Sequence, residues 1–271
     1  MQASETVSPT PVVQTERRGS ALWITINREE RRNAINPDAI AGIENALRGA
    51  AADSSLRAVV LTGRGEKAFC AGADLTRGTG VFSEGAVEPT TDFGRLARVA
   101  REFPLPLIAR INGACVAGGM GLMALCDMAI VADHARFGLP EAKVGVFPMQ
   151  VLVYLRRMIA PRYVNELCFT GELIDAQRAR EIGIANAVVP YAELDAAVDA
   201  MVGRVEQCSP QALRRGRYAI ASMEWMGFTE ALTFAESQIA LTSTAPDAKE
   251  GLQAFNEKRP PKWAAPGESH E

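Results

Sequence analysis

Apolar residues along the first half of the chain follow patterns that predict four strands. Alternation of apolar and polar residues over 22–26 predicts a strand with one buried face. The segment RAVVLTG at 57–63 carries four apolar residues in a row and ends in glycine, which predicts a buried strand. The segments 106–117 (PLIARINGACVA) and 127–132 each predict one further strand.

A different spacing predicts helices between these strands and through most of the second half. Ile40, Ile43 and Leu47 form a stripe at helical spacing, which follows the favourable helix start of Asn36 and Pro37. The glycine-rich segment after 106–117 is expected to open another helix. Further helices are expected at 92–103, 149–160, 162–169, 175–182, 191–207, 210–223, 228–242 and 247–257.

This order of elements predicts one α/β core followed by a helical region. Strands alternate with helices early and helices dominate late, so we expect a layered α/β fold. Residues 1–11 predict a mobile N-terminus, 12–208 the core, and 209–271 a helical C-terminal region. The glycine- and proline-containing segment 76–91 predicts a surface loop.

Composition narrows the class of protein. The 271 residues are 48% hydrophobic and 23% charged, which is typical of a globular protein with a sizeable core. A formal net charge of −3 argues against nucleic acid or an anionic membrane surface as a partner. The N-terminus lacks the basic start and apolar core of a secretion signal, so we expect a cytoplasmic protein with free thiols. Its cysteines are Cys70, Cys115, Cys126, Cys168 and Cys208, and they lack metal-ligand spacing.

The run NGACVAGGMGLMALCD at 112–127 concentrates small residues where a strand should end and a helix begin. It is no P-loop, because Gly119 and Met120 stand where such a loop needs Lys and Ser or Thr. His134 and His270 lie in no ligand-spaced cluster, so a metal site is not expected. Small residues at a helix start expose backbone N–H groups to an anion, or they let strand and helix pack closely. The residues alone leave both interpretations open.

Three segments resemble successive signatures of the crotonase, or enoyl-CoA hydratase/isomerase, family. They are KAFCAGADL (67–75), INGACVAGGMGLMALCDMAIVAD (111–133) and FGLPEAKVGVFP (137–148). The resemblance implies a crotonase-like spiral of ββα units with a C-terminal helical oligomerisation region that forms homotrimers or dimers of trimers. It also implies a small-molecule acyl-CoA substrate. Coenzyme A then arrives as part of the substrate, and no separate cofactor is implied.

The resemblance implies roles for individual positions. The backbone N–H groups of Ala73 and Gly118 would form an oxyanion hole for the thioester carbonyl, each worth about 3 kcal/mol in the transition state. Residues from Ala71 to Leu75 would line the path of pantetheine and adenine, with Asp74 shaping the loop. The candidates to bind the CoA phosphates, chosen by charge, are Arg31, Arg32, Arg64 and Lys67. Solvated surface charge is the alternative reading for each of them.

The chain departs from the family's hydratases at two positions. Glu141 matches the second of their two water-handling glutamates, but the first would fall at Gly121. Met149 follows Pro148 where hydratases usually carry glycine, and with Phe147 it is expected to line an acyl pocket and crowd out water. A single carboxylate in apolar surroundings suffices to move a proton between two carbons. We therefore expect an enoyl-CoA isomerase with Glu141 as proton shuttle. The alternatives are a hydratase that uses another acid and a non-catalytic CoA-ester-binding protein.

Overall fold

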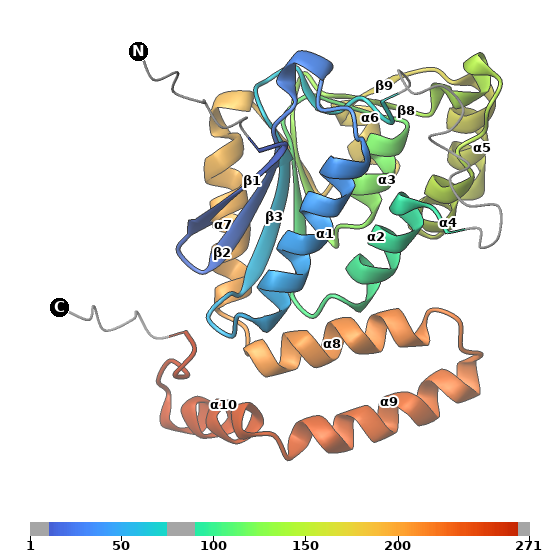
Figure 1. The fold of residues 1–271 in the computed structure, drawn as a ribbon. Coiled ribbons are helices and arrows are strands. Elements are labelled where there is room, and N and C mark those ends of the chain that lie inside the picture. The colour runs from blue at the N-terminus through green and yellow to red at the C-terminus, as the bar shows by residue number, and fades with distance from the viewer. Residues whose placement is uncertain (1–10, 75–89, 265–271) are drawn as a thin grey trace, which may run out of the picture.

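The computed structural model describes residues 11–74 and 90–264. The expected N-terminal segment 1–11 and the expected loop 76–91 lie outside these ranges, except for residues 11, 90 and 91. Within the described ranges the chain forms two β-sheets packed with helices, and three C-terminal helices lie below them (Figure 1). In this part of the chain, every helix is too short or too polar to span a bilayer.

Two sheets of unequal size form the centre of the molecule. The larger has six strands in the order β1-β2-β3-β5-β7-β10, and the smaller has four in the order β4-β6-β8-β9. The larger sheet comprises β1 (Val13–Arg18), β2 (Ala21–Ile26), β3 (Ala58–Gly63), β5 (Leu107–Ile111), β7 (Met128–Ala132) and β10 (Ala187–Val189). The smaller comprises β4 (Ala68–Cys70), β6 (Ala114–Val116), β8 (Arg136–Gly138) and β9 (Ile174–Asp175). All neighbours pair in parallel except β1 with β2 and β8 with β9.

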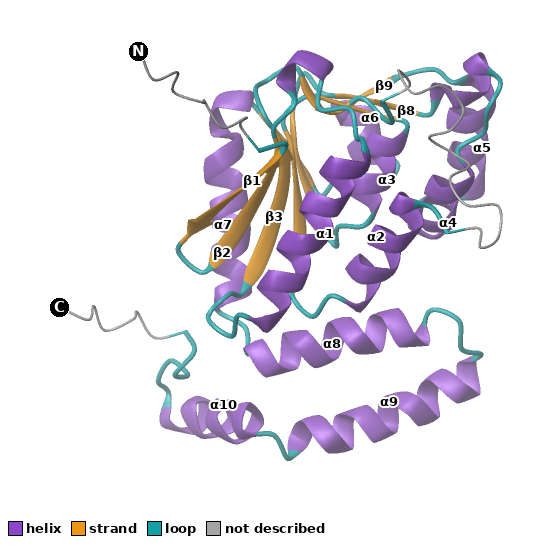
Figure 2. Ribbon diagram, in the orientation of Figure 1, coloured by secondary structure: helices purple, strands orange, loops and turns teal. Residues whose placement is uncertain are grey.

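The chain alternates between the two sheets as it advances. β3 leads into β4, β5 into β6 and β7 into β8, each time passing from the larger sheet to the smaller (Figure 2). β6 then leads into α3 (Gly118–Ala124), and β8 leads into the 3-10 helix η3 (Pro140–Val144). This repetition confirms the spiral of strand–strand–helix units expected from the sequence.

The segment 106–117 was expected to form one strand, and that expectation is wrong, because β5 and β6 belong to different sheets. The fully buried side chain of Asn112 lies at the corner between them. Its amide oxygen accepts a hydrogen bond from the N–H of Gly63 at 3.2 Å. Its amide nitrogen donates to the carbonyls of Gly65 at 2.8 Å and Ala68 at 2.9 Å. These hydrogen bonds pair the buried amide of Asn112 and hold the corner between β5 and β6. The pattern of apolar residues along the sequence carries no signal of this corner.

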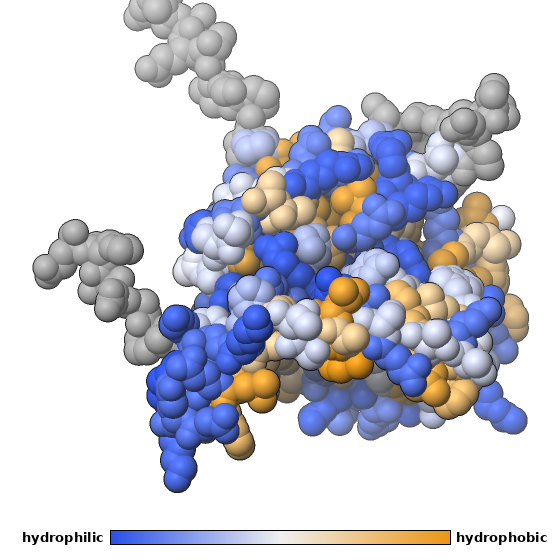
Figure 3. Space-filling model, turned by 90° about the horizontal axis from the view of Figure 1, so that it is seen from below, coloured by the Kyte–Doolittle hydropathy of each residue, from blue (hydrophilic) through white to orange (hydrophobic). Residues whose placement is uncertain are grey.

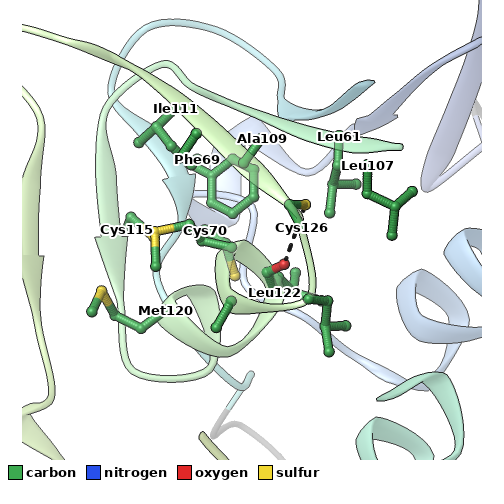
Figure 4. Packing of buried hydrophobic residues seen from close by; sticks show 14 of the residues in the cluster. Leu61, Phe69, Cys70, Leu107, Ala109, Ile111, Cys115, Met120, Leu122 and Cys126 are labelled. Atoms are coloured by element: carbon green, nitrogen blue, oxygen red, sulfur yellow. Dashed lines mark hydrogen bonds between the residues drawn. The ribbon is translucent and has the colours of Figure 1, made fainter. Parts of the chain in front are cut away.

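Helices cover both faces of the larger sheet (Figure 1). On one face lie α1 (Pro37–Ala52), α2 (Asp92–Glu102) and α3, and on the other lies α7 (Leu194–Glu206). Between the two sheets and α3 the core is filled by aliphatic, aromatic and sulfur-containing side chains such as Phe69, Cys70 and Met120 (Figure 4). All five cysteines are free thiols, and only Cys208 is exposed. The remaining elements of the core region are η1 (Glu29–Arg31), α4 (Met149–Met158), α5 (Pro161–Thr170), α6 (Ala176–Glu181) and η4 (Tyr191–Glu193).

The C-terminal region consists of α8 (Pro210–Met223), α9 (Phe228–Ser243) and α10 (Pro246–Glu257). Arg217 on α8 is bonded to Asp127 at 2.9 Å and also donates to the carbonyl of Ala100 at 2.9 Å. These bonds tie α8 to the core, although neither α8 nor α9 contributes a buried residue.

Large apolar side chains remain exposed on these three helices and on the turn between α8 and α9. We call this set the C-terminal apolar face, and it comprises Tyr218, Ile220, Trp225, Phe228, Leu232, Ile239, Leu241, Leu252 and Phe255. From below, apolar side chains interrupt the polar surface of the molecule (Figure 3).

Candidate active site

A cavity of about 1010 Å³ is lined by five separate segments of the chain. They are the residues from η1 to the start of α1, the residues after β4, the starts of α2 and α3, and the stretch from η3 into α4. One representative of each segment is Ile35, Ala73, Phe93, Gly118 and Glu141. The spiral therefore brings to one place the separate motifs that the sequence indicated.

The backbone amides of Ala73 and Gly118 lie close together at the cavity. Ala73 pairs with Ile35 in a parallel β-bridge. The N–H of Ile35 donates to the carbonyl of Gly72, and the carbonyl of Ile35 accepts from the N–H of Asp74, both at 2.8 Å. The N–H of Ala73 is not used in this bridge, and Gly118 is the first residue of α3 and has no acceptor within that helix. A Cβ placed on Gly118 would lie 3.6 Å from the Ala73 nitrogen. Neither amide donates to another described residue.

Close backbone packing accounts for other small residues of the same run. A Cβ on Gly119 would collide with the carbonyl oxygen of Cys70, so α3 approaches β4 only because residue 119 is glycine. Ala117 has φ 53° and ψ −123°, a conformation that costs a non-glycine residue about 1–3 kcal/mol and is typical of functional sites. The close-packing interpretation of the small-residue run is therefore confirmed at Gly119, and the anion-binding interpretation stays a prediction for Gly118.

Glu141 lies in η3 as the only glutamate among the described residues that line the cavity. Its Oε2 is buried and has no hydrogen-bond partner among the described residues. Burial raises the pKa of Glu141 above its ordinary value, because few polar groups replace the lost water. Val146 and Phe147 line the same cavity, as the sequence predicted for Phe147. A carboxylate in such surroundings is suited to accept a proton from carbon and to return it.

Position 121 offers no second carboxylate, and a side chain there would require the ring of Phe93 to move. A Cβ on Gly121 would lie 2.7 Å from Cζ of Phe93 and 3.2 Å from Cγ2 of Val151. Phe93 and Val151 both line the cavity. Sequence reasoning did not single out Phe93, because its only signal was an apolar position at the start of a helix. Met149 also lines the cavity, but its side chain is 68% exposed, which indicates a position at the rim.

The charged residues divide into those at the cavity and those away from it. Arg28 and Arg31 line the cavity, whereas Arg32, Arg64 and Lys67 do not. Arg28 forms a largely buried ion pair with Asp74 at 2.8 Å and also donates to the carbonyl of Ala34. Asp74 is thus part of the polar framework of its loop, and Arg28 is a contributor that sequence reasoning missed. Ala71 lines the cavity as well, and Leu75 lies outside the described residues.

Other titratable groups lie elsewhere. His134 contacts the carbonyl of Glu66 at 3.2 Å and packs edge-on against Tyr191, and it does not line the cavity. His270 lies outside the described residues. In the described ranges no three His, Cys, Asp or Glu side chains gather closely enough to hold a metal ion.

Comparison with known proteins identifies the relatives of this chain. The family model described as enoyl-CoA hydratase/isomerase matches residues 16–266. A Thermus thermophilus protein named "Putative enoyl-CoA hydratase" is 34% identical over 255 residues, which is 93% of this chain and 100% of that protein.

Solved structures agree with this assignment. An enoyl-CoA hydratase of Mycobacterium smegmatis is 31% identical, with a TM-score of 0.85 over 94% of this chain and 99% of its own. An enoyl-CoA hydratase of Bacillus anthracis is 30% identical, with a TM-score of 0.86 over 94% of this chain and 100% of its own. The chain therefore has the crotonase fold.

Proposed function

The chain belongs to the enoyl-CoA hydratase/isomerase family, and from this premise we propose that it shifts the double bond of an enoyl-CoA in fatty-acid or related acyl-CoA metabolism. The observation that carries the proposal is the carboxylate of Glu141, whose buried Oε2 has no partner among the described residues, in one cavity with the adjacent amides of Ala73 and Gly118. A family member with one such carboxylate is equipped for proton transfer and lacks a second group to handle water.

The mechanism we propose is a proton shuttle within one substrate. The amides of Ala73 and Gly118 donate to the thioester carbonyl oxygen, which makes the hydrogens on the adjacent carbon more acidic. Glu141 removes one of them, and the electron pair moves into the carbonyl oxygen to give an enolate stabilised by the two amides. Glu141 then returns the proton two carbons further along, so the double bond moves into conjugation with the thioester. No atom is gained or lost.

The CoA portion is proposed to follow the segment from Ala71 to Leu75, where Asp74 and Arg28 form a largely buried ion pair. Arg31 is the candidate cation at the cavity, and its charge suits a phosphate group. Arg32 and Lys67 remain candidates for phosphates that extend beyond the cavity.

Two alternatives remain. Several relatives are named enoyl-CoA hydratases, so hydration of a 2-enoyl-CoA with another acid in place of Gly121 is the second candidate. The third is a non-catalytic CoA-ester-binding protein. Glu141 argues against it, because an unpartnered buried carboxylate oxygen is costly to keep without a chemical use.

The deciding experiment compares both reactions and removes the carboxylate. Wild-type protein should isomerise a 3-enoyl-CoA faster than it hydrates a 2-enoyl-CoA, as followed by thioester absorbance and product analysis. Glu141→Gln should lower kcat by about 10²–10⁴-fold and leave CoA-ester affinity nearly unchanged, since glutamine has similar size but accepts no proton. Glu181→Gln, on the surface in an ion pair with Arg178, is the matched control. Efficient hydration with negligible isomerisation would favour the hydratase, and full activity of Glu141→Gln would refute the mechanism.

We also propose that the C-terminal apolar face joins copies of the chain into homotrimers or dimers of trimers. The support is the exposure of its large side chains in the single chain and the lack of any buried residue on α9.

A further inference from the structure

The volume that a side chain at position 121 would need is already occupied. A Cβ on Gly121 would lie 2.7 Å from Cζ and 3.1 Å from Cε2 of Phe93, and 3.2 Å from Cγ2 of Val151. The first distance is too short for any real Cβ contact. The glycine at position 121 therefore leaves no empty space where a carboxylate would be, because α2 places the aromatic ring of Phe93 there.

Phe93 is held firmly at that position. It is the second residue of α2, and the buried Leu96, Ala97 and Ala100 follow it at helical spacing on the same face. Thr91 caps α2 by accepting from the N–H of Gly94 at 3.0 Å, and its hydroxyl also accepts from the side chain of Gln150 on α4. The start of α2 is thus fixed by its own cap, by its buried face and by a bond to the neighbouring wall of the cavity.

The ring of Phe93 leaves an apolar surface beside position 121. A water molecule held at a buried site needs two to four polar partners. The three atoms nearest to a Cβ at position 121 offer none, since they belong to the apolar side chains of Phe93 and Val151. Glu141 is then the only carboxylate of the described cavity lining that lies in apolar surroundings, and a water bound to it alone is poorly placed to add across a double bond.

We propose that Phe93 is a specificity-determining residue that favours proton transfer over water addition by filling the volume of the missing side chain at position 121. The proposal rests on the function proposed above, and it assigns the choice of reaction to a residue from α2.

The test measures the ratio of hydration rate to isomerisation rate with 2-enoyl-CoA and 3-enoyl-CoA substrates. Phe93→Ala should raise this ratio by about tenfold or more, because it opens the cavity to water. Phe93→Leu keeps part of the apolar volume and should raise the ratio less. Gly121→Glu combined with Phe93→Ala should increase hydration by about another 10²-fold, since it adds a second acid–base group. With Phe93 in place, Gly121→Glu should gain far less, so the two substitutions should be strongly non-additive.

Phe169→Ala is the matched control, because Phe169 is an exposed aromatic residue outside the cavity lining, with its ring 6.0 Å from that of Phe147. Its ratio should equal that of the wild type. An unchanged ratio in Phe93→Ala, or in Phe93→Leu should the alanine variant fail to fold, overturns the role of Phe93 while the proposed function stands. A wild-type protein that converts neither substrate overturns both.

Discussion

The chemical use that we propose for Glu141 and its structural cost have the same origin. Its buried Oε2 has no partner among the described residues, and burial raises its pKa. The same desolvation that makes the carboxylate a better base also makes its charged form less favourable in the folded protein. Such a residue is expected where activity, rather than stability, determines the side chain.

The raised pKa of Glu141 predicts opposite pH effects on activity and stability. A base must be deprotonated, so kcat/KM should fall as pH decreases through the raised pKa, and this acid limb should lie above the ordinary value of 4.5. A raised pKa in the folded state gives a stabilising contribution that is present below the unfolded pKa and lost as pH rises through the folded one. Glu141→Gln should therefore have a higher Tm than wild type at pH 7, and the difference should vanish near pH 4. An acid limb below pH 4.5 would contradict the assignment of Glu141 as the base.

Single residues of the site differ in how far sequence could reveal them. Glu141, Ala73 and Gly118 each lie within a continuous motif, so their spacing identifies them. Phe93 lies outside the motifs that identified the site, and it meets the cavity only through the fold. The pattern of residues along the sequence does not show which helix packs against a given glycine.

At the scale of elements, the start of α3 combines close packing of the backbone with the amide that we propose binds the thioester oxygen. Gly119 lets the helix pack against β4, Ala117 turns the chain into it, and Gly118 presents its amide beside that of Ala73. A short helix of this kind has little stability of its own, so its position depends on the strands that it packs against.

Two substitutions at Gly118 separate the loss of the amide from the gain of a side chain. Gly118→Ala keeps the N–H and adds a Cβ that would touch only the flexible end of Ile35 at 3.3 Å and the neighbouring backbone beyond 3.5 Å. Gly118→Pro removes the donor and should lower kcat by about 10²–10³-fold, as loss of one oxyanion donor does. Circular dichroism would verify that both variants fold, since proline also restricts Ala117. Equal activity of the two variants would refute the role of the Gly118 amide.

The sequence predicted most elements but not how strands divide between sheets. Apolar runs identified β3, β5 and β7, and alternation identified β2. The expectation of one buried face for β2 is wrong, because Trp23 on its other face is buried against α7. β1 was not expected, because it is a polar edge strand (VQTERR) whose only pairing is with β2. The sequence predicts one strand over 106–117 in place of β5 and β6, because the corner depends on hydrogen bonds of the buried Asn112.

At the scale of the whole molecule, the C-terminal helices are connected to the core mainly through α8. Arg217 and its ion pair with Asp127 join α8 to the base of the core, while Arg101 and Arg157 both pair with Glu224 just beyond the helix. α9 packs on α8 and α10 and leaves large apolar side chains exposed. Exposed apolar area on a helix that adds nothing to its own core is typical of a subunit interface.

Sedimentation of the purified protein tests this reading. Phe228, Leu232 and Ile239 are spaced by four and seven residues and form one stripe along α9. Wild-type protein should sediment as a trimer or a hexamer at micromolar concentration. Leu232→Glu combined with Ile239→Glu should weaken association by tenfold or more, about 1.4 kcal/mol or above, because two charges would enter an apolar contact. Ser237→Glu adds charge to the same helix away from that stripe and should leave the assembly intact. A wild-type protein that is a stable monomer at micromolar concentration would show that the C-terminal apolar face has another use.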